Sequence, residues 1–379
     1  MALSKTGELT LLLAATLTIM VGTSLAPGLY SIATALGVKE YAPLLITLPA
    51  LGAILFAPLF GKCIDRMGSR KTLLLCLIGY FITGTGGALL YGPVPIALDR
   101  ILLGGFAAGI MAAGTAEISL WYTGKARLGM IAKQGMAVEF GGVIFLFVSG
   151  LLSEFAWHSP FLLYGLGFIC AVMCVLYIPA TQVNRPKTKL RSQNTSKKMR
   201  HIMSTTFFAM ILFFSLIISL PGHMSTLGFS SSQIGYLLSS ISLVAVFAAM
   251  VMPRVVTETS ERTTIILAFF SYAIAHVLFA SSTFTSVFIA GAIFAGIGFG
   301  FSTPLLTHST VEISSDTNRG HNLSRFAIAV FTGQFATSAL ELIHLPKSMI
   351  FYVCAFISVL CILALVIRAR PIPATKGSL

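Results

Sequence analysis

Apolar runs about as long as a membrane is thick recur along the whole sequence. A helix of about 20 residues crosses the hydrocarbon core of a bilayer, and twelve runs reach or approach that length. Lipid admits only helices or closed barrels, and no ten-residue alternation typical of barrel strands occurs. We therefore expect an all-α membrane protein with twelve transmembrane helices. The runs lie near residues 9–35, 41–60, 73–91, 94–118, 135–153, 160–179, 203–221, 232–252, 264–281, 284–308, 324–343 and 348–367.

The first run invites comparison with a secretory signal. It is longer than the apolar core of a signal peptide, and eleven further runs follow it. We therefore expect it to be retained as a transmembrane helix.

Charge is scarce and its placement is uneven. Only 10% of the 379 residues are charged and 56% are hydrophobic, whereas soluble domains carry about 25% charged residues. The net charge of +13 lies almost entirely in short loops between the runs, which fits a membrane protein and not a nucleic-acid binder. If the N-terminus is cytoplasmic, 22 Lys and Arg side chains face the cytoplasm and two, Lys39 and Lys347, face outward. The bias predicts an integral protein of a bacterial inner membrane with both termini cytoplasmic.

The longest loop, near residues 180–202, is polar and basic. It divides the chain into two halves of six runs, which we expect at 1–180 and 203–379, with 181–202 as a cytoplasmic linker. Its seven Lys and Arg side chains could bind anionic lipid or a regulator, but an orientation signal on a solvated tether is the simpler interpretation.

The two halves resemble weak repeats. An offset of 192 residues places Arg70 on Arg262 and Gly104 on Gly296, while Arg100 falls on Ala292. Parallel repeats joined by a central loop are one of the known transporter architectures.

The loop between the second and third runs, GKCIDRMGSRK at 61–71, carries a recognisable pattern. It resembles the G-x-x-x-D-R-x-G-R-R/K signature of the major facilitator superfamily, with Ser69 at a usually basic position. The resemblance implies two pseudo-symmetric six-helix bundles and a latch at the inner gate, separate from the substrate site. The matching residues are Gly61, Asp65, Arg66, Gly68, Arg70 and Lys71.

Simple chemistry suggests a part for several residues of this loop. We expect Gly61 to end a helix, Asp65 to cap a helix N-terminus, and Arg66 and Arg70 to pair with carboxylates at neighbouring helix ends. Glu117, near the same end of the fourth run, is a candidate partner in these gate ion pairs.

Arg100 is the one Lys or Arg well inside a predicted span, since Arg325 is the second residue of its run and is counted with the cytoplasmic side. A buried arginine is costly in lipid unless it faces a cavity or a partner. Asp99–Gly109 is similar to the superfamily's R-x-x-x-G pattern through Arg100 and Gly104, which implies a role in proton coupling. Asp99 precedes Arg100 by about 100° of helix rotation, so we expect that the two do not simply neutralise each other. The alternative is that both are hydrated at the outer membrane face.

Residues 141–161 resemble the fifth span of drug antiporters. Gly141 and Gly150 match the g-x-x-x-G-P-x-x-G-G signature, but Phe145, Leu146 and Ser149 stand where G, P and G are expected. The missing Gly-Pro pair is a departure from the routine proton/drug antiporter.

Three further polar residues within the spans are candidates for the site. Glu139 can carry a coupling proton or join the inner gate. Gln334 is hard to place against lipid and is expected to face the cavity, and His276 is a possible proton carrier. The 29 phenylalanines suit an aromatic-lined pocket.

Nothing in the sequence indicates an enzyme, a cofactor or a metal site, and the absence of a nucleotide-binding motif indicates transport driven by gradients. The preferred function is proton-coupled export, by a monomer in lipid, of a small amphipathic compound such as a drug-like molecule or a siderophore. The alternatives are uptake or facilitated diffusion of a polar metabolite, and a non-transporting sensor on the same fold.

Overall fold

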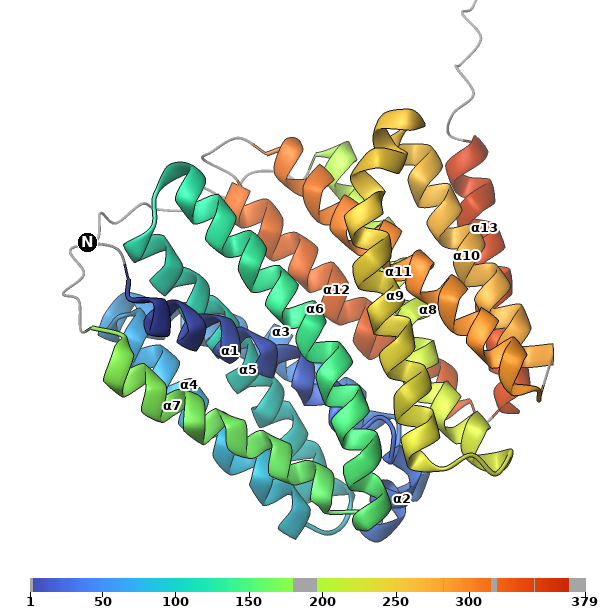
Figure 1. The fold of residues 1–379 in the computed structure, drawn as a ribbon, viewed down its shortest axis with the longest axis horizontal. Coiled ribbons are helices and arrows are strands. Elements are labelled where there is room, and N and C mark those ends of the chain that lie inside the picture. Colours follow the sequence, from blue (N-terminus) through green and yellow to red (C-terminus); the bar gives the residue numbers. More distant parts are fainter. Residues whose placement is uncertain (1–2, 180–195, 282, 315–318, 344, 368–379) are drawn as a thin grey trace, which may run out of the picture.

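The computed structural model describes residues 3–179, 196–281, 283–314, 319–343 and 345–367. These residues form helices and connecting turns, with no strand among them (Figure 1). The long helices are α1 (Lys5–Thr23), α3 (Leu44–Met67), α4 (Ser69–Gly86), α5 (Pro93–Trp121), α6 (Gly124–Phe155), α7 (Leu166–Tyr177), α8 (Lys197–Thr226), α9 (Ser231–Glu258), α10 (Glu261–Ser281), α11 (Thr285–Glu312), α12 (Arg319–Leu342) and α13 (Lys347–Ile367). The short elements are α2 (Leu29–Ala35) and the 3-10 turns η1 (Lys39–Tyr41), η2 (Gly87–Leu89) and η3 (Ser159–Gly165).

Each of the twelve expected runs coincides with helix. Eleven helices are long and apolar enough to cross a membrane, and α12 supplies the twelfth position with 24 residues. The run expected at 9–35 is divided, because α1 ends at Thr23 and α2 begins at Leu29. The run at 160–179 begins with the 3-10 turn η3 before α7.

The start of α8 differs from the sequence-based expectation. The helix begins at Lys197, so residues 197–202, assigned above to the linker, are helical. Ser196 sets this start because its hydroxyl accepts a hydrogen bond of 3.1 Å from the amide of Met199, which satisfies one of the free N–H groups of the first turn. The remainder of the expected linker, 181–195, lies outside the described residues.

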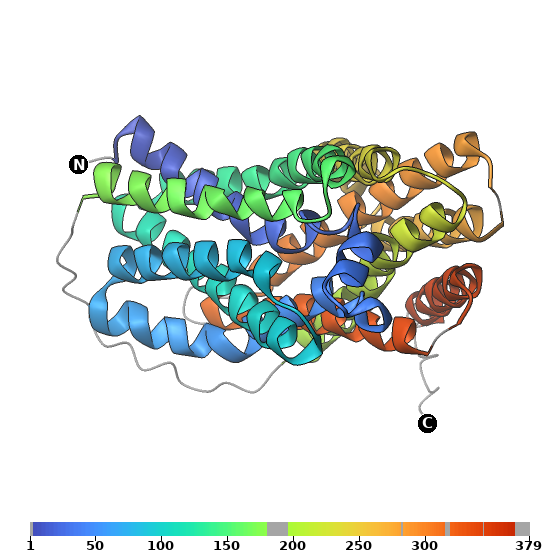
Figure 2. The same cartoon turned by 90° about the horizontal axis from the view of Figure 1, so that it is seen from below.

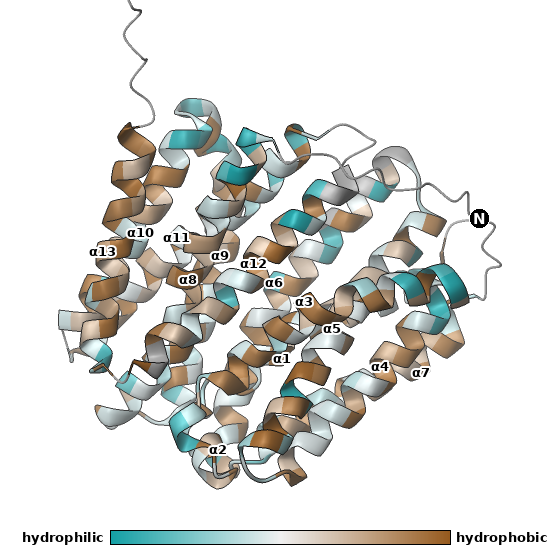
Figure 3. Ribbon diagram, turned by 180° about the vertical axis from the view of Figure 1, so that it is seen from behind, coloured by the Kyte–Doolittle hydropathy of each residue, from teal (hydrophilic) through white to brown (hydrophobic). Residues whose placement is uncertain are grey.

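The helices form two bundles side by side, α1–α7 and α8–α13 (Figures 1 and 2). The bundles meet chiefly along two helix pairs, α6 with α9 and α3 with α12. Hydrophobic residues dominate the middle of the helices, and hydrophilic residues gather toward their ends (Figure 3). Such a surface suits a surrounding bilayer.

The helices end at two opposite faces of the molecule. The basic end is where α3, α5, α9 and α11 finish, and it includes Gly68. The α2 end is the opposite one, where α6 finishes and α9 starts.

Hydrogen bonds join the bundles in the half toward the α2 end. Both the amide and the hydroxyl of Ser232 donate to Oε1 of Glu154, at 3.2 and 2.6 Å. The hydroxyl of Ser338 donates to that of Thr47 at 2.8 Å.

The 192-residue offset has a structural counterpart. A Cβ on Gly104 would collide with the backbone carbonyl of Pro49, and a Cβ on Gly296 would collide with that of Ile241. Both residues of the second pair lie 192 positions after those of the first. The same backbone-to-backbone helix contact, α3 with α5 and α9 with α11, therefore occurs in each bundle.

Candidate functional site

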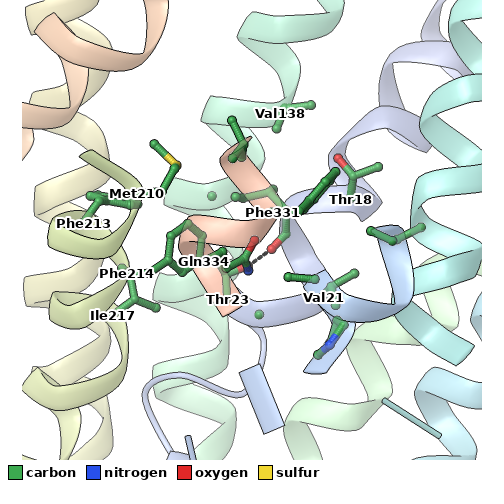
Figure 4. A pocket seen from close by; sticks show the side chains of 18 of the residues that line it. Thr18, Val21, Thr23, Val138, Met210, Phe213, Phe214, Ile217, Phe331 and Gln334 are labelled. Carbon is green, nitrogen blue, oxygen red and sulfur yellow. Dashed lines mark hydrogen bonds between the residues drawn. The ribbon is translucent and has the colours of Figure 1, made fainter. Parts of the chain in front are cut away.

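A cavity of about 250 Å³ lies between the two bundles. Helices α1, α3, α5 and α6 line it from one bundle, and α8, α9, α11 and α12 line it from the other. Figure 4 shows Gln334 and Phe331 of α12 reaching between α1 and α8. A site shared by both bundles is where a relative tilt of the bundles alters access.

Aromatic and aliphatic side chains make up most of the cavity wall. The rings of Phe213 and Phe299 stack with centroids 3.9 Å apart, and Phe214 and Phe331 also line the cavity. Such a wall favours an apolar or planar ligand.

Few polar groups interrupt this wall. The hydroxyls of Thr18 and Thr23 donate to carbonyls of their own helix, at Ala15 and Ile19, which leaves mainly their methyl groups and lone pairs for a ligand. The hydroxyl of Thr303 is buried with no hydrogen-bond partner among the described residues, so it can donate to a bound molecule.

Glu139 is the one ionisable side chain among the described residues that line the cavity. It lies on α6, whereas Gln334 lies on α12 of the other bundle. The sequence singled out both as polar residues within spans, and the structure brings them to the same cavity. The cavity therefore combines an apolar wall with one acid and one amide.

Asp99 and Arg100 do not line this cavity. Arg100 is 1% exposed and Asp99 8% exposed, so the alternative of hydrated side chains at the outer face is wrong. The expectation that they would not neutralise each other is also wrong. Nε and Nη2 of Arg100 donate to Oδ2 of Asp99 at 2.9 and 2.5 Å. The long arginine side chain reaches back across the helix rotation that separates the two Cα atoms.

Arg100 is nevertheless connected to the cavity wall. Its Nη1 donates to the hydroxyl of Tyr164 at 3.5 Å, and that hydroxyl donates at 3.0 Å to the carbonyl of Val21, which lines the cavity. Tyr80 donates in the same way to the carbonyl of Leu17 at 2.7 Å. The ion pair thus lies behind α1 and holds the tyrosine that contacts it.

The loop at 61–71 departs from expectation at Gly61. This residue lies inside α3, so the prediction that it ends a helix is wrong; Gly68, at φ +89°, ends α3 and precedes α4. Glycine adopts this left-handed conformation without a steric penalty. Asp65 lies in the last turn of α3, and the N-cap position of α4 belongs to Gly68, so the helix that follows Asp65 is not the one it caps. Capping of another helix by Asp65 stays a prediction.

The expected ion pairs of Arg70 and Glu117 are replaced by other bonds. Nη2 of Arg70 donates to the carbonyl of Val175, at the end of α7, at 3.0 Å, where a helix dipole attracts a cation. Glu117 is fully buried and accepts hydrogen bonds from the hydroxyl of Ser69 at 2.6 Å and the indole N–H of Trp121 at 3.1 Å. Arg66 is exposed.

The loop and the two bundles match a known family. The sequence model of the Major Facilitator Superfamily matches residues 11–201 and 202–378. The chain belongs to this superfamily. The resemblance drawn from the loop at 61–71 is therefore confirmed, together with the fold of two helical bundles.

Named members of the superfamily show partial similarity. The chain is 29% identical over 250 residues to the class B tetracycline resistance protein of Escherichia coli, an alignment that covers 61% of each chain. It is 25% identical over 273 residues to the class D tetracycline resistance protein of Salmonella ordonez, covering 65% of this chain and 67% of the relative. The alignments thus span 61% and 67% of the length of these relatives.

The superfamily fold is also found across the whole chain. The nucleoside transporter NupG has a crystal structure that superposes with a TM-score of 0.76 at 14% identity. The superposition covers 96% of this chain and 99% of that structure. At this identity the likeness concerns the fold alone.

Sequence reasoning missed the partners of Glu117. By the superfamily signature Ser69 was only a departure from the pattern, yet its hydroxyl is one of the two donors that form hydrogen bonds to Glu117. A signal existed in the repeat, because Glu261 and Ser309 stand 192 residues after Ser69 and Glu117 and are also hydrogen-bonded, at 2.9 Å. The acid and the hydroxyl have exchanged helices between the two bundles.

His276 lies outside the cavity. Its ring is fully buried in the second bundle, with Nε2 3.1 Å from the carbonyl of Leu212. This arrangement resembles a structural histidine, which holds two helices together.

Proposed function

We propose that the protein exports a small, largely apolar compound, drug-like or a secreted metabolite, in exchange for protons. The observation that carries this proposal is the cavity between the bundles, with its aromatic wall and the single acid Glu139. The resistance proteins to which the chain is similar are named for tetracycline. The apolar wall disfavours the alternative, uptake of a polar metabolite, because such a cargo would lose its hydration without replacement.

Glu139 is proposed to hold the coupling proton. An isolated carboxylate in an apolar cavity is costly, so either a proton or a cationic group accompanies it. A cargo with an amine or a strong hydrogen-bond donor can replace the proton, and its departure allows the proton to return. Gln334 and Thr303 then supply neutral hydrogen bonds that orient the cargo.

Asp99 and Arg100 are proposed to act on this site indirectly. Through Tyr164 the pair contacts the carbonyl of Val21, so its charge state or position affects the wall formed by α1. We expect Arg100→Ala to abolish gradient-driven transport in protein that still reaches the membrane. Transport by Arg100→Ala at the wild-type rate, with unchanged pH dependence, would remove Arg100 from the coupling machinery.

The remaining parts follow the superfamily scheme. Residues 1–180 and 197–379 are proposed as the rocking halves of a monomer, with both termini and the linker at 181–196 in the cytoplasm of a bacterium. The loop residues Gly61, Asp65, Arg66, Gly68 and Arg70, with Glu117, are proposed to serve the conformational change. Cysteines placed in the linker at 181–196 should resist an impermeant thiol reagent in intact cells, and ready labelling would overturn this topology.

Proteoliposomes test the function directly. Wild-type protein should move a fluorescent amphipathic cation, such as ethidium, faster when a pH gradient is imposed than when it is collapsed. Glu139→Gln should bind ethidium, but its flux should no longer depend on the pH gradient. Gln334→Ala should bind ethidium more weakly, but its flux should still depend on the pH gradient. Flux that ignores the pH gradient in wild-type protein would contradict proton coupling, and an absence of flux across a broad panel of amphipathic compounds would contradict export.

A further inference from the structure

A second, polar cavity of about 580 Å³ lies within the second bundle at the basic end. The starts of α8 and α10 and the end of α11 surround it, with Leu365 of α13 beside them. It is separate from the transport cavity, with which it shares no lining residue. Its polar lining consists of Lys198, His201, Thr205, Glu261, Arg262, Ser309 and Glu312.

An apolar groove of about 370 Å³ continues from this cavity along the bundle. It runs between α8, α10 and α13, and shares His201, Thr205 and Leu365 with the polar cavity. Phe208 and Leu360 on its edge are 38% and 47% exposed, so the groove opens on the outer, lipid-facing surface. Its floor includes the fully buried Phe269.

The charges of the polar cavity are balanced. Two are positive, Lys198 and Arg262, and two are negative, Glu261 and Glu312. A purely anionic ligand would meet as much repulsion as attraction. A ligand that carries a cation and an anion a few ångströms apart can satisfy both pairs.

The first bundle shows which group the cavity lacks. There, Glu117 is buried and receives donors from Ser69 and from the indole N–H of Trp121. In the second bundle Glu261 keeps the hydroxyl partner, Ser309, but Ile313 stands 192 residues after Trp121. The side chain of isoleucine has no N–H group, and Ile313 lines the open cavity. One N–H donor to the carboxylate is therefore missing, together with the bulk of an indole ring.

We propose that this cavity and the groove bind one diacyl phospholipid with a phosphoethanolamine head group. Its ammonium donates to Glu261 and Glu312 in place of the indole N–H. Its phosphate lies near Lys198 and Arg262, where the first turn of two helices adds N–H donors. Nη2 of Arg262 donates to the carbonyls of Leu365 and Val366, so the phosphate contacts another edge of this guanidinium. An acyl chain occupies the groove over Phe269. This lipid would stabilise the second bundle whatever the transported compound is, so the inference does not depend on the proposed function.

Three lipids with identical acyl chains separate the alternatives. Phosphatidylcholine has the same charges as phosphatidylethanolamine but no N–H donors, and phosphatidylglycerol has only the negative charge. Purified, delipidated protein is titrated with each lipid, and native mass spectrometry counts the lipids retained. We expect phosphatidylethanolamine to bind about tenfold more tightly than either of the others, the difference made by one hydrogen bond to a charged group.

Two substitutions locate the site. Glu261→Gln should lower the phosphatidylethanolamine affinity about tenfold, to the level of phosphatidylcholine, because it removes the charge of the acceptor. Ile313→Trp copies the first bundle, fills the cavity and should remove the bound lipid. Glu258→Gln is the matched control, since this acid pairs with Arg254 on the exposed surface and should leave binding unchanged.

Three results would overturn the proposal. Equal retention of phosphatidylethanolamine and phosphatidylcholine, or a preference for phosphatidylglycerol, would show that the ammonium is not recognised. Wild-type binding by Glu261→Gln would place the lipid elsewhere. Thermal melting of each variant in lipid-free detergent verifies that it is folded. If Ile313→Trp does not fold, the result with Glu261→Gln alone decides between the outcomes.

Discussion

The buried Asp99–Arg100 pair permits a sharp stability prediction. Asp99→Ala removes two charge-assisted hydrogen bonds and leaves a guanidinium that is 1% exposed. The remaining hydrogen bonds of Arg100, to the Tyr164 hydroxyl at 3.5 Å and the Thr83 carbonyl at 3.4 Å, are long. The rings of Phe161 and Tyr164 also lie beneath the guanidinium, with centroids at 5.7 and 5.6 Å, but neither supplies a negative charge. Breaking a buried pair from one side costs about 3–5 kcal/mol, because the other charge stays buried without a partner.

A double variant isolates this charge effect. Asp99→Ala combined with Arg100→Met leaves the same gap at position 99 but removes the stranded cation. Because buried ion pairs are often replaced by apolar residues at little net cost, we expect the double variant to recover about 2 kcal/mol or more of the loss. The second bundle has the apolar Ala292 at the position equivalent to Arg100, so an uncharged residue is compatible with this place in the fold.

Unfolding by SDS in mixed micelles measures these differences, with the fluorescence of Trp121 and Trp157 as the signal. Glu258→Ala serves as the control, since its pair with Arg254 is exposed and should be worth less than about 1 kcal/mol. The reasoning is refuted if Asp99→Ala unfolds like this control, or if the double variant is as unstable as the single one.

Three further outcomes are expected. Gly104→Ala should prevent recovery of folded, monodisperse protein, because its Cβ would strike the backbone of α3. Gly61→Ala is the control and should be recovered like wild type, because the space around Gly61 is open. Equal recovery of the two variants would contradict the close contact between α3 and α5. Burial and a hydrogen bond to Glu8 raise the pKa of Tyr122 to about 12, so the stability due to this group is present below pH 10 and is lost as the pH rises through about 12. Absorbance titration should show this ionisation shifted toward pH 10 in Glu8→Gln, and an unshifted titration would refute the assignment. Asp65→Asn should slow the transport cycle more than it weakens binding, as measured by flux and binding side by side; normal flux with weakened binding would show that Asp65 belongs to the cargo site instead.

The fold could be predicted because its main determinant is local. Each span can be recognised from about 20 consecutive apolar residues. The equivalent positions of Gly104 and Gly296 in the repeat also indicated two similar bundles. Helix limits depend on single caps and turns, so the early start of α8 after Ser196 and the end of α3 at Gly68 were missed.

The cavity was within reach of the sequence only in part. Glu139 and Gln334 could be selected because a polar side chain within a span needs a place away from lipid, and both line the cavity; their roles in transport remain predictions. Side-chain partners were beyond reach, because they depend on rotamers and on helix packing. A hydroxyl 48 residues away binds Glu117, and Arg100 folds back onto the residue next to it.

The contact between Gly150 and Gly235 has a mechanical consequence for the proposed rocking motion. At this point α6 and α9 touch backbone to backbone, so neither glycine places a side chain in a groove of the other helix. Interdigitated side chains must leave their grooves before two helices can tilt, and this gives a packed interface discrete stops. The contact between the two glycines has no such stops and can serve as a pivot. Resistance to tilting must then come from contacts near the pivot, such as the hydrogen bond of Ser232 to Glu154 and the stacked rings of Phe147 and Tyr236.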